Sequence, residues 1–239
     1  MYSFPPIAAA IEALYTVVTS LTSLLTPALG ATSAAIAIVL LTFMVRVFLL
    51  PLGYAQARGE HSRARLAPKL RELQRRHRHN PERLNREMNA LYAEQGASPL
   101  AGCLPTLAQA PIFSVLYGLF LVREVGGHAN ALLTDVLAGV PLGAHLASTG
   151  GPGLLVYVGL FSLLAVVAWL GRRLSPPFDS DAPGATVVRF LPYGTIVVAA
   201  FVPLAAGLYL LASTAWTAAE RAVFRRLIDR RERSGQPPR

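Results

Sequence analysis

Long apolar runs alternate with short basic stretches along the chain. Four such runs cover residues 36–54, 100–122, 154–170 and 190–219. A helix needs about 20 mostly apolar residues to cross the hydrocarbon core of a bilayer. The first three runs come close to that length, and polar sequence separates them. The pattern therefore predicts an all-α integral membrane protein.

The last apolar run is too long for one crossing. It holds 30 residues without a charge, which is about 45 Å as a single helix against a core of about 30 Å. Arg189 and Arg221 flank it, so a single crossing would leave one basic flank outside, against the positive-inside tendency. Pro203 stands near its middle. We therefore expect two short spans, each about 22 Å long, that turn near Pro203.

The sequence thus predicts a five-span core with the amino terminus outside and the carboxyl terminus in the cytosol. The expected segments are an outer interfacial helix over 1–30, span 1 over 31–54, a cytosolic helical hairpin over 55–97, span 2 over 98–123, an outer loop over 124–153, span 3 over 154–171, a cytosolic loop over 172–189, span 4 over 190–203, span 5 over 204–220 and a basic cytosolic tail over 221–239. Residues 31–220 form a single core in this layout.

The first 30 residues are expected to form an amphipathic helix that lies in the membrane interface. Its apolar positions recur at helical spacing, with serine and threonine on other faces. These positions are Ile7, Ile11, Leu14, Val18, Leu21 and Leu25. Glu12 is the only charged residue there. The alternative is a disordered, mildly apolar leader.

Residues 55–97 are strongly basic and read as two antiparallel helices. Asn80 followed by Pro81 is a helix start signal, because Asn caps free N–H groups and Pro fits the first helical position. The basic faces are either a solvated surface or a docking surface for anionic lipid or ribosomal RNA. The residues expected on a contact surface are Arg65, Lys69, Arg76, Arg83 and Arg86.

Composition agrees with a membrane protein and argues against several other classes. The chain is 53% hydrophobic and carries a formal net charge of +9. Cys103 is the only cysteine, which excludes an internal disulfide framework. The histidines lack metal-ligand spacing, and the spans hold no paired carboxylates and no serine–histidine pair. We expect no metal, no cofactor, no DNA partner and no enzymatic chemistry.

One charge interrupts the first apolar run. Arg46 at the centre of a spanning helix costs roughly 2.5–3.5 kcal/mol on insertion scales. Thr42 lies one helical turn earlier, so both side chains point to the same face. The helix is expected to end near Pro51 and Gly53, about 10 Å beyond Arg46. Either the arginine snorkels to the nearby headgroups, or it has water, a partner or a function within the membrane.

Several strings resemble one known family. Residues 98–113, SPLAGCLPTLAQAPIF, closely resemble the start of the second core span of YidC-type membrane protein insertases, the YidC/Oxa/Alb group. Residues 40–52, LLTFMVRVFLLPL, resemble their first core span, and residues 80–96 resemble the second helix of their cytosolic hairpin. Residues 203–214 match the last-span pattern more loosely, with Pro203, Tyr209 and Ser213 in register.

The resemblance implies a non-enzymatic membrane protein insertase or chaperone of the bacterial plasma membrane. It implies that the arginine lies in a hydrated groove open to cytosol and lipid, where the polar tail of a nascent membrane protein enters before the apolar segment passes into the bilayer. The groove residues that it implies are Arg46, Thr42, Gln109, Tyr209, Thr106 and Ser114. Nascent membrane proteins and anionic lipids are the implied partners, with the ribosome and a Sec-type translocon as further candidates.

A different class stays open, namely a small transporter or channel with an anion site at Arg46. Transporters usually contain internal repeats, and none is visible in this sequence. RNA binding by the basic hairpin alone is a third reading. Against it, Tyr92 is the only residue there among Phe, Trp and Tyr that could stack on bases.

Overall fold

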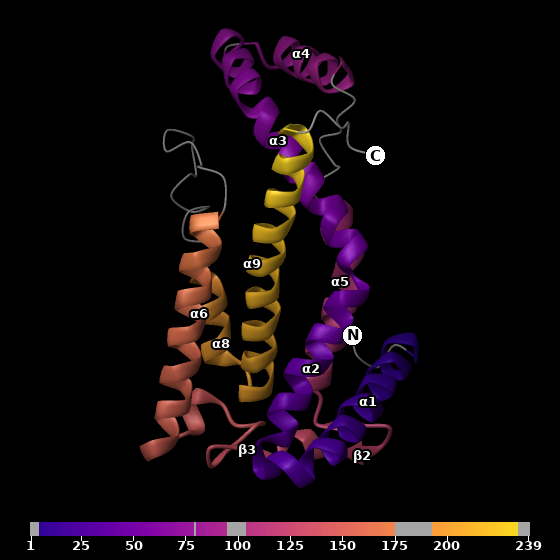
Figure 1. Cartoon of the computed structure of the whole chain (residues 1–239), viewed down its shortest axis with the longest axis vertical. Helices are drawn as coiled ribbons and strands as arrows, with labels where there is room; N and C mark the ends of the chain where they lie inside the picture. Colours follow the sequence, from indigo (N-terminus) through magenta and orange to yellow (C-terminus); the bar gives the residue numbers. More distant parts are fainter. Residues whose placement is uncertain (1–4, 79, 95–103, 175–192, 234–239) are drawn as a thin grey trace. The chain divides into compact units, whose positions relative to one another are not determined.

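The computed structural model describes residues 5–78, 80–94, 104–174 and 193–233, and these are mostly helical (Figure 1). The chain forms two compact units. The first comprises Met1–Phe48 and Pro111–Ala219, and the second comprises Leu49–Ala110 and Glu220–Arg239. The predicted all-α class is confirmed, apart from two short hairpins in one loop.

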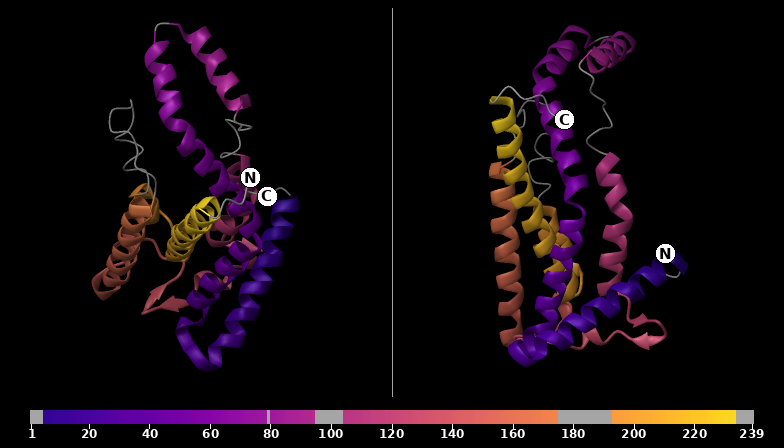
Figure 2. Two further views of the ribbon diagram at one scale, coloured as in Figure 1. Left: turned by 45° about the horizontal axis from the view of Figure 1, so that its top comes forward. Right: turned by 45° about the vertical axis from the view of Figure 1, so that its right-hand side comes forward.

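The first unit contains the apolar helices. They are α1 (Pro5–Leu29), the 3₁₀ turn η1 (Gly30–Thr32), α2 (Ser33–Phe48), most of α5 (Leu104–Leu121), α6 (Leu154–Leu174), α8 (Gly194–Phe201) and the first part of α9 (Leu204–Arg233). Helices α1 and α2 form a V joined by η1, as both views in Figure 2 show. Within the described residues, two helical stretches, Pro5–Phe48 and Gly151–Leu174, are long and apolar enough to cross a membrane.

The last apolar run is interrupted beside Pro203, where the sequence predicts a turn. Helix α8 ends at Phe201, Val202 is extended, and α9 begins at Leu204. Proline causes this break because it has no N–H to continue the helical hydrogen bonds. The length of about 22 Å expected for each of the two membrane-crossing segments stays a prediction. Helix α9 has 30 residues and continues past the apolar run to Arg233.

The loop between α5 and α6 is folded. It contains antiparallel pairs of β1 (Glu124–Val125) with β2 (His128–Ala129) and of β3 (Val136–Leu137) with β4 (Val140–Pro141), and the 3₁₀ turns η2 (Ala131–Leu133), η3 (Leu146–Ser148) and η4 (Gly151–Gly153). The buried Asn130 side chain donates hydrogen bonds to the carbonyls of Leu119 and Val122, at 2.8 and 3.0 Å. Asn130 thereby satisfies free carbonyls at the end of α5.

The same loop caps the start of α9. The backbone N–H of Leu204 donates to the carbonyl of Ala144 at 2.9 Å, and that of Ala205 donates to the carbonyl of Leu142 at 2.8 Å. The first N–H groups of a helix have no partner within the helix. The loop supplies these partners, so it fixes where α9 begins.

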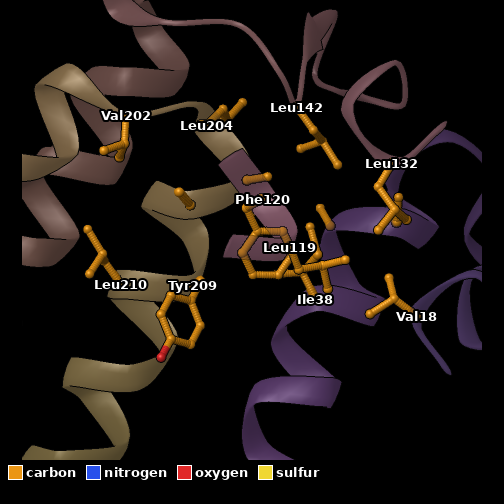
Figure 3. Close-up of a cluster of buried hydrophobic side chains, with 14 of the residues drawn as sticks. Val18, Ile38, Leu119, Phe120, Leu132, Leu142, Val202, Leu204, Tyr209 and Leu210 are labelled. Carbon is orange, nitrogen blue, oxygen red and sulfur yellow. The ribbon is translucent and has the colours of Figure 1, made fainter. Parts of the chain in front are cut away.

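The core of the first unit joins all of these elements. Figure 3 shows Val18 of α1, Ile38 of α2, Phe120 of α5, Leu142 of the loop and Tyr209 of α9 in one apolar cluster. All five side chains are buried. Burial of one such side chain contributes about 1.5–3 kcal/mol to folding in a water-surrounded protein. In a bilayer, their close packing is the larger contribution.

The second unit contains α3 (Leu50–Arg76), α4 (Pro81–Glu94) and the end of α9. The sequence pattern placed the end of the first span helix near Pro51 and Gly53, and this is wrong. Helix α2 ends at Phe48, and α3 runs through both residues after a turn at Leu49. Pro51 lies in the first turn of α3, where a missing N–H costs no hydrogen bond.

Two contacts attach α3 to α9 inside the second unit. The rings of Tyr54 and Phe224 meet edge to face, with centroids 5.4 Å apart. The carboxylate of Glu220 lies directly against Gly53, where a Cβ atom would overlap it. A Cβ atom at position 53 would therefore require the Glu220 carboxylate to move.

Candidate functional site at the junction of α2 and α9

Arg46 lies near the end of α2 and is half-buried. Its Nη2 atom donates a hydrogen bond to the hydroxyl oxygen of Ser213 on α9, at 2.5 Å. No carboxylate forms an ion pair with Arg46 among the described residues. The recorded partner is thus a neutral hydroxyl, which orients the guanidinium without neutralising its charge.

Tyr209 lies one turn before Ser213 on α9, and both side chains are buried. The Tyr209 hydroxyl lies near the Ser213 side chain and near the charge of Arg46. The Tyr209 ring packs against the ring of Phe120, with centroids 5.9 Å apart and the planes tilted by 40°. Figure 3 shows the Tyr209 hydroxyl pointing away from the labelled apolar side chains. Arg46, Ser213 and Tyr209 therefore form a polar cluster at the edge of the core.

A second contact joins the same two helices. The rings of Phe43 on α2 and Trp216 on α9 lie with centroids 5.6 Å apart. The indole Nε1 atom of Trp216 is buried and has no hydrogen-bond partner within the described part of the chain. The junction between α2 and α9 thus combines one polar contact with one aromatic contact.

The remaining predicted groove residues have different surroundings. Thr42 is buried, and its hydroxyl donates to the carbonyl of Ile38 in its own helix at 2.8 Å. Ser114 is half-buried on α5, and the described contacts do not join it to Arg46. Thr106 and Gln109 belong to α5, but their side chains lie outside the described residues.

Ser213 is the functional candidate that sequence reasoning did not select. It occurs in the last-span pattern, one helical turn after Tyr209, and that spacing was the available signal. The sequence could not identify its partner, because Arg46 is 167 positions away. Small hydroxyl residues are also common in membrane helices, where they bond to neighbouring helices or to their own backbone.

The five basic residues predicted as a contact surface on the hairpin are all exposed. Two of them form ion pairs within their own helices: Arg76 with Glu72, and Arg83 with Glu87 at 3.1 Å. The Arg83 side chain, which donates to Glu87, holds the pKa of that carboxyl below its ordinary value. His77 at the end of α3 also contacts Glu87, at 2.8 Å, so this carboxylate links the two helices.

The predicted start of the second hairpin helix is confirmed in its details. The side-chain oxygen of Asn80 accepts a hydrogen bond from the backbone N–H of Arg83 at 3.0 Å. Pro81 is the first residue of α4. Both observations follow the preference of helix starts for an Asn cap and a proline in the first position.

A guanidinium has five N–H donors, and one of those of Arg46 is used by Ser213. The others can bind a carboxylate or another oxygen acceptor that approaches the half-buried side chain. Apolar surroundings strengthen this attraction relative to water. The apolar helices are those of a membrane protein, and this cluster places a half-buried cation at the edge of its apolar core.

The family model described as "60Kd inner membrane protein" matches residues 24–231. The chain is 32% identical over 174 residues to the membrane protein insertase YidC of Campylobacter jejuni, which covers 73% of this chain and 30% of that protein. It is 42% identical over 104 residues to the membrane protein insertase YidC of Clostridium perfringens, covering 43% of this chain and 44% of that protein. It is 28% identical over 213 residues to the chloroplast inner membrane protein ALBINO3 of Arabidopsis thaliana, covering 80% of this chain and 46% of that protein.

The chain therefore belongs to the YidC/Oxa/Alb family of membrane proteins. It spans less than half of the length of each of these relatives. Their names describe membrane protein insertases and an inner membrane protein, and none of them names an enzymatic reaction.

Proposed function

We propose that this protein is a membrane protein insertase and chaperone. A nascent membrane protein presents its polar tail to a positively charged, hydrated groove that opens to the cytosol and to lipid. The tail crosses part of the membrane there, and the apolar segment that follows moves sideways into the bilayer. The relatives' names support the general activity, and Arg46 supports the mechanism.

The observation that carries the mechanism is the neutral partner of Arg46. A carboxylate partner would neutralise the guanidinium and remove its attraction for a client. The hydrogen bond to Ser213 leaves the full charge in place. A positive charge within a low-dielectric wall attracts the acidic residues of a polar tail more strongly than the same charge in water. Thr42, Ser114 and Tyr209 of the first unit are the proposed wall residues beside Arg46.

In this proposal the protein lies in a bacterial plasma membrane with five spans. The amino terminus and the 124–153 loop face outward, and the hairpin and the carboxyl terminus face the cytosol. The basic residues in the hairpin favour the cytosolic side. Anionic lipids, the ribosome and a Sec-type translocon are the proposed partners of the exposed hairpin residues Arg65, Lys69, Arg76, Arg83 and Arg86. No nucleotide, metal or covalent step enters the mechanism.

Complementation in cells depleted of their own insertase tests this function. Two versions of one client are compared, one with an acidic outer tail and one with the acidic residues changed to their amides. We expect Arg46→Ala to lower insertion of the acidic client about tenfold, the effect of losing one hydrogen bond to a charged group, and to change insertion of the neutral client much less. Arg46→Lys is the matched control, because it keeps the charge.

Membrane levels of each variant are measured alongside insertion, so that loss of protein is not mistaken for loss of function. If Arg46→Ala inserts the acidic client as well as the wild-type chain at equal levels, the role proposed for Arg46 is wrong. If the wild-type chain inserts neither client, the proposed insertase activity itself is wrong.

A further inference from the structure

Ser213 and Arg46 meet in a way that suggests a specific role for the serine. Arg46 is two residues from Phe48, the last residue of α2, which is about 3 Å along the helix axis. Val47 and Phe48 beside it are 51% and 81% exposed. A long arginine side chain this close to a helix end would normally turn toward the polar boundary, which lowers the cost of its charge.

The side chain does not lie free at that end. Its Nη2 atom is held by the Ser213 hydroxyl on α9, and Ser213 is only 4% exposed. The bond is a tether between two helices, and it holds the guanidinium against a buried hydroxyl of α9. Side chains on a helix lean toward its amino terminus, which is compatible with this contact.

The tether is itself held in place. Ser213 has one hydroxyl proton and two lone pairs. One lone pair accepts from Arg46, and the Tyr209 hydroxyl lies near the Ser213 side chain. The Tyr209 ring is fixed by its packing against Phe120. The packing of Phe120 against Tyr209, and the proximity of Tyr209 to Ser213, therefore restrain the Ser213 side chain.

We propose that Ser213 is the positioning residue of the client site: it holds the Arg46 guanidinium inside the apolar region and leaves it charged. This inference deepens the proposed function and rests on it. The ligand class is the carboxylate of an acidic client tail. An acidic residue at position 213 would also hold the Arg46 guanidinium, but its carboxylate would neutralise the positive charge that attracts the client.

The test compares Ser213→Ala with Thr214→Val in the full chain, using the acidic and neutral clients described above. Both variants remove one hydroxyl from neighbouring positions of α9. The Thr214 hydroxyl donates to the carbonyls of Leu210 and Leu211 in its own helix, so its loss should not affect Arg46. We expect Ser213→Ala to lower insertion of the acidic client about threefold to tenfold, and Thr214→Val to leave it unchanged.

A double-mutant cycle distinguishes positioning from a general structural effect. If Ser213 acts through Arg46, adding Ser213→Ala to Arg46→Ala produces no further loss, because the residue that it positions is already gone. Equal loss for the acidic and neutral clients, or additive losses in the double variant, would overturn the inference. Wild-type insertion by Ser213→Ala would also overturn it. In each of these cases, a defect of Arg46→Ala alone still supports the proposed function.

Discussion

The partner of Arg46 decides how this arginine can act. A guanidinium paired with a buried carboxylate is a structural element, and removal of either partner is strongly destabilising. Arg46 instead has a neutral hydroxyl partner and remains half-buried. Within the described residues no carboxylate neutralises the positive charge of Arg46, which suits the client-binding role proposed for it.

Trp216 provides a prediction about the same junction. Its buried Nε1–H has no described partner, and an unsatisfied buried donor costs about 1–3 kcal/mol. We expect Trp216→Phe to leave the thermal unfolding temperature in detergent unchanged or to raise it, because the ring contact with Phe43 is kept. We expect Trp216→Ala to lower that temperature, because this contact is lost.

Trp169→Phe serves as the control for Trp216, since Trp169 is 50% exposed on α6. If Trp216→Phe is as destabilising as Trp216→Ala, then the indole N–H does have an acceptor in the folded protein. The account of this junction would then need an additional polar partner.

The sequence identified Arg46 because a charge is uncommon in an apolar run, and it identified Tyr209 through the resemblance of residues 203–214 to the last-span pattern of the family. It missed Ser213 because a single hydroxyl in such a run has many ordinary explanations. Pairing between distant positions also cannot be read from local periodicity. Only the packing of α2 against α9 identifies the partner of Arg46.

At the scale of secondary-structure elements, the start of α9 depends on the loop that precedes α6. Leu204 and Ala205 donate to carbonyls of Ala144 and Leu142, so the loop acts as an external cap. Gly143 lies between these two acceptors. A Cβ atom there would lie 2.9 Å from the carbonyl oxygen of Leu133, so the backbone would have to move.

We therefore expect Gly143→Ala to destabilise the protein by about 1–3 kcal/mol, the usual cost of overpacking a closely packed site. Thermal unfolding in detergent is the measurement. Gly150→Ala in the same loop is the control, because a Cβ atom at Gly150 meets nothing within 4 Å. Equal stability of the two variants would show that the close packing of Gly143 against Leu133 is not needed to hold the loop at the start of α9.

Local signals predicted some helix boundaries and failed at others. The break beside Pro203 and the start of α4 at Pro81 were predictable, because proline and an Asn cap act through the adjacent backbone. The end of α2 was placed too late because Pro51 was taken as a helix terminator. Pro51 instead lies in the first turn of the next helix, a position where proline is favourable. The folded loop was also missed, because its hairpins are only two residues per strand.

At the scale of the whole molecule, the alternation of apolar and basic segments predicted the membrane class, and the resemblance of residues 98–113 and 40–52 to YidC-type insertases predicted the family. The apolar helices gather in one unit, and the basic hairpin belongs to the other. Hydrophobic periodicity reports which residues avoid water, but it does not report which helices meet. The arrangement around Arg46 therefore required the structure, whereas the membrane class did not.

The central claim is that the charge of Arg46 selects acidic client tails, and charge reversal tests it most directly. Insertion of one client is measured with an acidic tail and with a basic tail, by the wild-type chain, Arg46→Gln and Arg46→Glu. Relative to the neutral Arg46→Gln variant, we predict that the wild-type chain favours the acidic tail and that Arg46→Glu favours the basic tail. The same tail preference in all three proteins, at equal membrane levels, would contradict the account.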